Sequence, residues 1–376
     1  MDLSKSIDFL LENAGCVIQY RLKKEILNNL SKTEEANLLE QIYQTPNFKL
    51  VQSYVKPNGY IGSGMHSWGN WRGEILHQTP LQDGEAAARL LAYYAVPNTH
   101  LIIADFIKAV RDESILRHEF SYIPPEIPRF ENRFVGLNNG NCLMALIYTM
   151  QALLRRGDDT DELRQFQHIC LKGFQRVLSL SDISDITKTR KSKAKYSYPY
   201  IESDEYFPCS YTLAMLAHTK NWRTPEAVKL VANALNHINK IMKPDNNMHV
   251  RIGDNYYAPG FALNRPLRPF RAETVDTILY RRPLTEIAML GAPDDVDIIK
   301  ETIVNLENAL SADGILHIAF ESAYQKRTFY ESMKWSGAYT DMFLETDMKR
   351  RYALECDLTF WAVQFLSLVK GGEQNV

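Results

Sequence analysis

The stretch NCLMALIYTMQALLRRGDDTDELRQFQHICLKGFQRVL, residues 141–178, contains two helical segments of different character on either side of a short break. The first, CLMALIYTM (142–150), is apolar on nearly every face, as expected of a helix that is buried all round. The second is amphipathic, because its apolar residues share one stripe at helical spacing: Leu163, Phe166, Ile169, Cys170, Phe174, Val177 and Leu178. The pattern predicts a hairpin made of an inner and an outer helix.

The same pairing recurs along the chain. Breaks at Pro97, Gly157, Pro225 and Pro293 each separate a short apolar helix from an amphipathic one, and such regular spacing is typical of helical repeats. Further helices are predicted near 3–13, 15–30 and 352–370. We therefore expect an all-α fold over residues 1–376, a single α/α toroid of about six helical hairpins. In this arrangement residues 1–44 pack on the ring, and residues 45–376 form the repeated hairpins.

Long connections rich in aromatic residues lead from each outer helix to the next inner helix, at roughly 45–82, 112–136, 180–207, 243–282 and 311–350. Loops of this length are uncommon unless they are functional or disordered. Because all of them enter inner helices at the same end, we expect them to gather at one mouth of the ring. Within them, MHVRIGDNYYAPGF (248–261) and GILHIAF (314–320) are predicted to form short strands.

The composition is that of an ordinary globular protein, with 45% hydrophobic and 23% charged residues. A net charge of −2 gives no general attraction to nucleic acid or to acidic membranes. The five cysteines are scattered without a CxxC motif, which is typical of a reducing compartment. No apolar run is long enough for a transmembrane segment, and the N-terminus lacks signal-peptide character. We expect a cytoplasmic protein that does not bind nucleic acid; the sequence indicates no cofactor and leaves the oligomeric state open.

Two segments carry a resemblance to a known family. IDFLLENAGCVIQYRLKKEIL (7–27) and LAHTKNWRTPE (216–226), together with the paired-helix spacing, resemble bacterial proteins with prenyltransferase and squalene-oxidase-type repeats. That group belongs to the α/α-toroid superfamily of class II terpenoid cyclases and protein prenyltransferase β subunits. The resemblance implies a toroid, and an isoprenoid as one class of ligand.

The catalytic signatures of that superfamily are absent from the sequence. The chain contains neither the DxDD motif with which class II cyclases protonate an alkene nor the D-x-C with which prenyltransferases hold zinc. RRGDDTDE (155–162) and PDDVD (293–297) resemble acidic metal motifs, but their carboxylates follow helix breaks and are interpreted as helix caps. Whether the protein is an enzyme therefore stays open.

Four carboxylates are candidate catalytic acids. Glu202 and Asp204 precede the inner helix that begins near Pro208, and Glu355 and Asp357 stand at the start of the last inner helix. A carboxyl group desolvated by aromatic neighbours has a raised pKa and can act as a general acid. The alternative for each is a helix-capping role.

The candidate ligand-binding residues come from the connections. GYIGSGMHSWGNWRGEILHQTP (59–80) places two tryptophans and two histidines before the inner helix beginning near Asp83, and the histidines lack metal-ligand spacing, so no metal site is predicted. Asn139 and Asn141 flank Gly140, and one asparagine there is expected to cap the next helix. The full set of candidates is His66, Trp68, Trp71, His77, Asn139, Asn141, Tyr206 and Arg271.

Two further features keep alternatives open. Arg271 is followed by Glu273 and Asp276, which also fits a plain ion-paired connection. The basic segment KTRKSKAK (188–195) is either a solvated loop or a lip that attracts an anion.

Three functions agree with these observations. The first is a terpenoid-cyclase or prenyltransferase-like protein that binds an isoprenoid or another largely apolar small molecule in a central aromatic-lined cavity, with carboxylate acid–base chemistry. The second is a carbohydrate-active (α/α)-barrel hydrolase or lyase, in which the aromatic residues stack on a saccharide and two carboxylates act on it. The third is a non-catalytic helical-repeat binding protein.

Overall fold

A computed structural model of the chain describes residues 2–64, 83–120, 136–140, 142–190, 199–242, 248–257, 267–335 and 340–371. In these ranges the protein is mostly helical and carries one small sheet. Several of the long connections lie partly outside the described residues, including most of 59–80.

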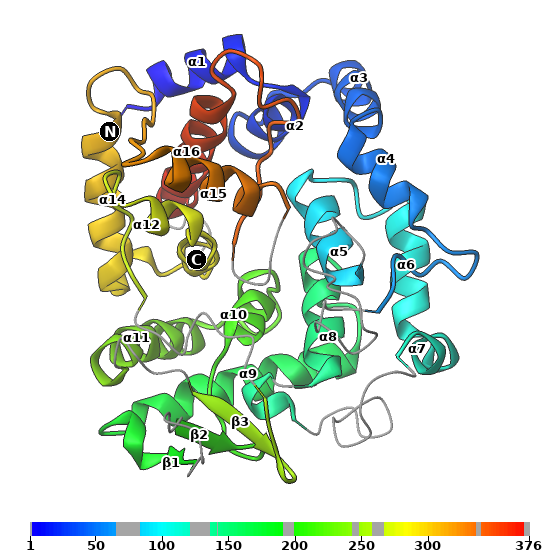
Figure 1. Ribbon diagram of the computed structural model, residues 1–376, viewed down its shortest axis with the longest axis vertical. Helices are drawn as coiled ribbons and strands as arrows, with labels where there is room; N and C mark the ends of the chain where they lie inside the picture. Colours follow the sequence, from blue (N-terminus) through cyan, green and yellow to red (C-terminus); the bar gives the residue numbers. More distant parts are fainter. Residues whose placement is uncertain are drawn as a thin grey trace.

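Four pairs of helices follow the predicted hairpin pattern. The first members are α5 (Gly84–Tyr93), α8 (Leu143–Leu153), α10 (Ser210–Ala217) and α13 (Arg282–Ala288). The second members are α6 (Leu101–Arg111), α9 (Asp161–Leu178), α11 (Pro225–Ile241) and α14 (Asp297–Leu310). The first members contact one another in chain order, and α13 then contacts the C-terminal helix α16 (Ala353–Gly371). Figure 1 shows the second members further out, along the rim of the molecule.

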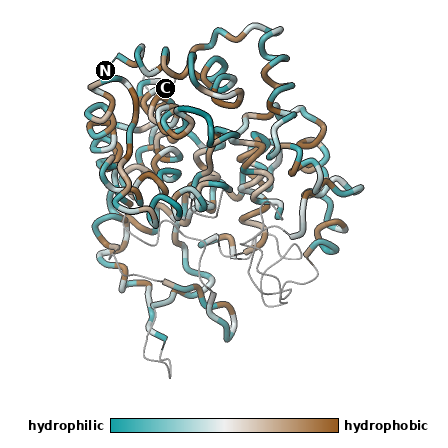
Figure 2. Tube along the Cα trace, turned by 45° about the horizontal axis from the view of Figure 1, so that its top comes forward, coloured by the Kyte–Doolittle hydropathy of each residue, from teal (hydrophilic) through white to brown (hydrophobic). Residues whose placement is uncertain are grey.

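Burial separates the two kinds of helix as predicted. Every residue of α8 and α10 is buried, whereas α9 buries one side only. Two residues of the predicted apolar stripe on α9 are not fully buried: Ile169 is half-buried, and Leu178 is 41% exposed at the end of the helix. Hydrophobic residues are correspondingly frequent in the interior helices in Figure 2.

The N-terminal segment packs against the end of the chain. It comprises α1 (Ser4–Asn13), α2 (Cys16–Arg21) with a π-helical continuation η1 (Leu22–Ile26), α3 (Lys32–Tyr43) and α4 (Pro46–Ser53). Helix α1, α2 and η1 all contact α16. The helix predicted over 15–30 ends at Ile26, before Asn28 adopts a left-handed conformation at φ 51°. The predicted helix over 352–370 is confirmed by α16.

The long connections contain helices that the sequence analysis missed. They are α4, α7 (Glu113–Glu119), α12 (Val275–Leu279), α15 (Ala323–Met333) and the 3₁₀ turn η5 (Ile183–Asp185). Two further 3₁₀ turns lie outside these connections: η4 (Leu137–Asn139) just before α8, and η6 (Pro293–Asp295) in the break between α13 and α14. The prediction of a strand in GILHIAF is wrong, because residues 314–320 are described and form no strand.

The sheet has four short strands in the order β1 (Lys188–Thr189), β2 (Pro199–Glu202), β3 (His249–Ile252) and β4 (Asn255–Tyr257). β3 and β4 confirm the strands predicted within 248–261. β2 and β3 run parallel, with Tyr200 opposite His249, while the other two pairs are antiparallel. The α10–α11 hairpin connects the parallel pair, and the sequence did not predict that pairing.

The inner helices begin with different caps. Helix α5 begins beside Asp83 as predicted, and the Asp83 carboxylate caps it by accepting the Ala86 amide at 2.8 Å. Cys142 and Cys209 occupy the N-cap positions of α8 and α10, so the expected asparagine cap is wrong for the described Asn139. Within the ranges given above, no helix combines the length and the apolar character needed to cross a membrane.

Candidate functional site

A buried ion pair lies on α5, the first of the inner helices. Arg89 Nε and Nη2 donate to Glu85 Oε1 at 3.1 and 2.8 Å, and the two side chains are 1% and 5% exposed. The Tyr211 hydroxyl on α10 reaches Glu85 Oε2 at 3.5 Å. Although burial lowers the pKa of Arg89, the charge of Glu85 and other neighbours raises it above its usual value, so the guanidinium stays charged.

A second group of charges comes from α13 and the chain that leads into α16. Arg281 donates to Asp341 Oδ2 at 3.1 Å and to Asp357 Oδ2 at 3.0 Å. Asp357 Oδ1 also accepts the Leu344 amide at 2.5 Å. Nε of the next residue, Arg282, lies 3.7 Å from Oε1 of Glu286 one turn along α13, and both side chains are 4% exposed.

Electrostatic coupling joins the two groups. The pKa of Tyr93 is raised to about 12, mainly by burial and then by Asp341, against the opposing effects of Arg282 and Arg89. Burial likewise raises the pKa of Glu286, and Arg282 and Arg89 oppose the shift. We call the combined set the central cluster: Glu85, Arg89, Tyr93, Arg281, Arg282, Glu286, Asp341 and Asp357.

Burying the charged groups of the central cluster costs free energy. Removing a carboxylate or guanidinium from water carries a penalty of several kcal/mol that a partner offsets only in good geometry. Pairs of this kind contribute little net stability relative to apolar side chains of the same size. Three guanidinium groups on otherwise apolar inner helices therefore indicate a role other than holding the fold together.

Some buried donors of the cluster have no protein partner in the described part of the chain. They are Arg89 Nη1, Arg281 Nη1 and the Tyr93 hydroxyl. An unpaired buried polar group costs about 1–3 kcal/mol, and native proteins keep few of them without water, an ion or a ligand. The three donors mark the cluster as a place where an acceptor can bind.

One side of the cluster is aromatic. Trp361 stacks beside Phe270 with ring centroids 5.3 Å apart, and its indole nitrogen donates to Thr285 Oγ1 at 2.9 Å. The Arg281 guanidinium lies 5.4 Å from the Trp361 ring centroid. Burial raises the pKa of nearby Asp357, while Arg281 and the Leu344 amide lower it.

Among the carboxylates predicted from the sequence, only Asp357 belongs to the central cluster. Glu355, two residues earlier on α16, is half-buried; burial raises the pKa of Tyr330 on α15, and Glu355 raises it further. Glu202 pairs with Lys188 at 2.8 Å and Arg251 at 3.4 Å on the sheet, and Asp204 is exposed in the following turn. Figure 1 shows β2 at the bottom of the view and α16 near the top, so the structure does not bring these pairs together.

Three of the predicted ligand-binding residues are described by the structure, and each makes hydrogen bonds or ion pairs outside the central cluster. Asn139 is fully buried, and its amide nitrogen donates to the carbonyls of Ser203 and Glu205 at 3.2 Å each, which ties two connections together. Arg271 pairs with Glu301 at 2.8 Å on the surface rather than with Glu273 or Asp276. Tyr206 is half-buried, and its amide donates to Glu205 Oε1 at 3.2 Å.

The remaining candidates, His66, Trp68, Trp71, His77 and Asn141, lie outside the described residues, as does most of the basic segment 188–195. Its first residues, Lys188 and Thr189, form β1.

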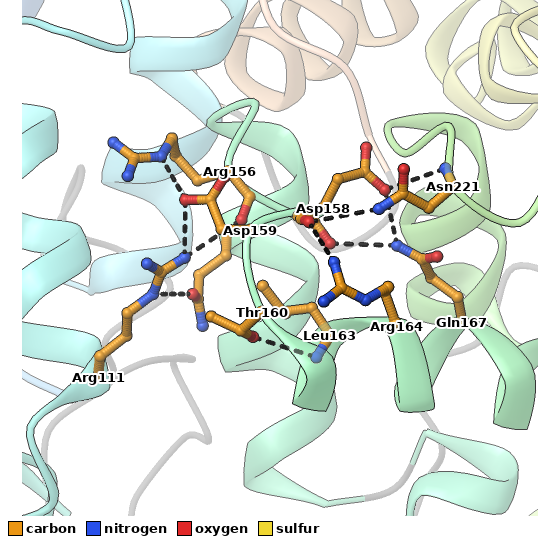
Figure 3. A network of polar contacts seen from close by, with 11 residues as sticks. Arg111, Arg156, Asp158, Asp159, Thr160, Leu163, Arg164, Gln167 and Asn221 are labelled. Carbon is orange, nitrogen blue, oxygen red and sulfur yellow. Dashed lines mark hydrogen bonds and ion pairs between the residues drawn. The ribbon is translucent and has the colours of Figure 1, made fainter.

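The acidic motif at 155–162 has a structural role. Figure 3 shows Asp159 turned toward Arg111 and Arg156, and Asp158 turned toward Gln167 and Asn221. Thr160 caps α9, while Asp161 and Glu162 stand in its first turn. Nowhere in the described ranges do three or more His, Cys, Asp or Glu side chains form a group that could hold a metal ion.

A surface depression of about 510 Å³ lies beside the same loop. It is lined by Ala104, Ile107, Lys108, Arg111, Asp112 and Arg156. Arg111 is already engaged there by Gln151 Oε1 at 2.7 Å and by Asp159, and Arg156 by Asp159. The central cluster, with its buried unpaired donors, is the stronger candidate site.

Comparison with known proteins adds no relative: no protein-family model, no curated protein and no solved structure matches the chain.

Proposed function

We propose that the protein is an α/α toroid that binds a polar small molecule at the centre of its inner helices and performs acid–base chemistry on it. The observation that carries the proposal is the central cluster itself. It gathers ionisable groups from α5, α13 and α16 on helices that are otherwise apolar.

The succession of helix contacts supports a ring. The inner helices touch in the order α5, α8, α10, α13, α16, and α16 contacts the N-terminal helices. From that segment Arg21 Nη1 donates to the Tyr93 carbonyl at the end of α5, at 3.1 Å. This hydrogen bond links the last members of the series back to the first.

The composition of the cluster favours a hydrophilic ligand over an aliphatic one. A site for a hydrocarbon would place one acid in an apolar cavity, whereas this cluster holds several carboxylates and arginines side by side. Carbohydrate-type chemistry, in which paired acidic groups act on a saccharide, therefore fits better than alkene protonation. Glu286, whose pKa is raised by burial, is our candidate general acid.

One observation favours the isoprenoid alternative. Asp357 is a buried carboxyl group with a raised pKa, and Arg281, its ion-pair partner, lies against the Trp361 ring. Aromatic rings beside a protonatable carboxyl group would suit a carbocationic reaction of the terpenoid-cyclase type.

Thermal-shift measurements test the proposal. Panels of oligosaccharides and of isoprenoid alcohols and diphosphates are screened with the wild-type protein, and a ligand at a hundred times its Kd should add about 2.7 kcal/mol of stability. Glu286→Gln should diminish the shift of any hit. Glu113→Gln is the matched control, because Glu113 forms an exposed i,i+4 pair with Arg117.

A hit that shifts wild type and Glu286→Gln equally would place the ligand elsewhere. No shift with either panel would favour the non-catalytic repeat protein.

A further inference from the structure

Helix α5 presents two buried hydrogen-bond donors one turn apart. Arg89 Nε and Nη2 donate to Glu85, and neither Arg89 Nη1 nor the Tyr93 hydroxyl has a hydrogen-bond partner among the described residues. Residues four apart share one face of a helix. Arg89 also lowers the pKa of Tyr93, so the two groups interact.

The Glu85 contact fixes the direction of the free donor. A guanidinium group is planar and presents its N–H bonds in a rigid fork. With one edge bound to Glu85, which itself accepts from Tyr211, the remaining edge is held ready for a second acceptor. Such preorganised donors lower the entropy that binding costs.

Several guanidinium groups influence the histidine at the end of α10. Burial lowers the pKa of His218, at the end of α10, to about 3, and the next causes are Arg89, Arg155, Arg223 and Arg282, which all lower it. The imidazole is therefore neutral at physiological pH and adds no charge of its own. The guanidinium groups of Arg89 and Arg282 favour an anion over a cationic group beside them.

The carboxylates of the cluster do not cancel this preference. Glu85 is held by Arg89 at 2.8 Å, and Asp341 and Asp357 are held by Arg281 at 3.1 and 3.0 Å. Glu286 is more distant from its partner Arg282, at 3.7 Å. Burial favours its neutral form, in which it does not repel an incoming anion.

We infer that the ligand of the central cluster carries an oxyanion, a carboxylate or a phosphate, and that Arg89 Nη1 and the Tyr93 hydroxyl donate to its oxygens. The inference rests on the proposed function, because it specifies the ligand of the same site. It makes Arg89 and Tyr93 specificity-determining residues.

The test compares charged probes with neutral counterparts in the intact protein. Inorganic phosphate, glucuronate and farnesyl diphosphate are titrated beside glucose and farnesol, with binding followed by calorimetry and thermal shift. We expect the anionic member of a pair to bind at least tenfold more tightly. All titrations are made at the same ionic strength, because salt screens the interactions between charged groups.

Tyr93→Phe separates ligand binding from stability. Because the hydroxyl has no partner in the described ranges, its loss should leave the free protein at least as stable as wild type. Binding of the anionic probe should weaken about tenfold, the loss expected for one hydrogen bond to a charged group. Tyr94→Phe is the matched control. Its buried hydroxyl accepts from Asn47 Nδ2 at 3.1 Å, so this variant should lose stability and keep its affinity.

Two results would overturn the inference. One is equal affinity for the charged and neutral members of each pair, which would leave a polar ligand site but remove the oxyanion. The other is unchanged affinity of Tyr93→Phe for an anionic probe. Absence of binding by every probe, charged or neutral, would instead count against the proposed function together with this inference.

Discussion

Glu345 links the N-terminal segment to the chain that leads into α16, and its protonation makes the stability of this contact depend on pH. Its Oε1 accepts the Gly15 amide at 2.6 Å at the start of α2, and its Oε2 pairs with Arg350 at 3.0 Å. A β-carbon at position 15 would lie 2.7 Å from Oε2, so a larger residue there would require the Glu345 side chain to shift. Burial raises the pKa of Glu345 to about 7, while the Gly15 amide and Arg350 lower it.

This shift gives a pH-dependent free energy of unfolding. A carboxyl group with a raised pKa binds its proton more tightly in the folded state, so its contribution is complete below the unfolded pKa, about 4.3, and is lost as pH rises toward 7. Relative to Glu345→Gln, the wild-type protein should lose on the order of 3 kcal/mol between pH 4.5 and 8. Urea unfolding at several pH values measures the difference, and parallel pH profiles for the two proteins would contradict the assignment.

The environment of an ion pair decides its role, and sequence spacing does not reveal that environment. Glu85 with Arg89 and Glu113 with Arg117 are both i,i+4 pairs, yet the first is buried and the second is exposed. Asp357 was predicted as a candidate because it stands in an apolar helix. The same criterion, applied to GEAAARLL and RRPLTEI, would have found Arg89 and Glu286 but not Asp341, which lies outside any helix.

At the scale of elements, the turn between α8 and α9 joins neighbouring hairpins. The Asp158 carboxylate accepts the amides of Lys220 and Asn221, at 3.0 and 3.2 Å, and the Gln167 side chain at 2.9 Å. It thereby connects this turn to the turn between α10 and α11. Asp159, next in sequence, only joins partly exposed arginines.

Replacing these two aspartates should have unequal effects. Asp158→Ala leaves three donors without their acceptor and should lower the free energy of unfolding by about 2–3 kcal/mol. Asp159→Ala removes solvent-accessible ion pairs and should cost less than about 1 kcal/mol. Chemical denaturation of both variants measures the difference, and equal losses would show that the turn-to-turn contact is not stabilising.

Helix type and order were predictable because burial imposes a clear pattern on each helix. The all-apolar α8 and the striped α9 followed directly from their sequences. Helices α7 and α12, of seven and five residues, are too short to show a period, and the β2–β3 pairing joins strands separated by a helical hairpin. Such long-range pairing depends on tertiary packing rather than on local sequence.

For the whole molecule, the central question is why an interior of apolar helices holds so many charges. The ring of contacts brings α5 and α13, far apart in sequence, to one cluster, and no local motif can indicate that meeting. Of the charged residues in the cluster, only Asp357 was predicted from the sequence as a site residue. We propose that the charged groups of the cluster serve to bind a ligand that carries an oxyanion.

The most direct measurement is a crystal structure of the protein grown with selenate, whose selenium atom is located by anomalous scattering. We predict a selenium peak with selenate oxygens within hydrogen-bond distance of Arg89 Nη1 and the Tyr93 hydroxyl. Peaks confined to exposed arginines such as Arg111 and Arg271, with both central donors bonded to protein atoms, would contradict the account.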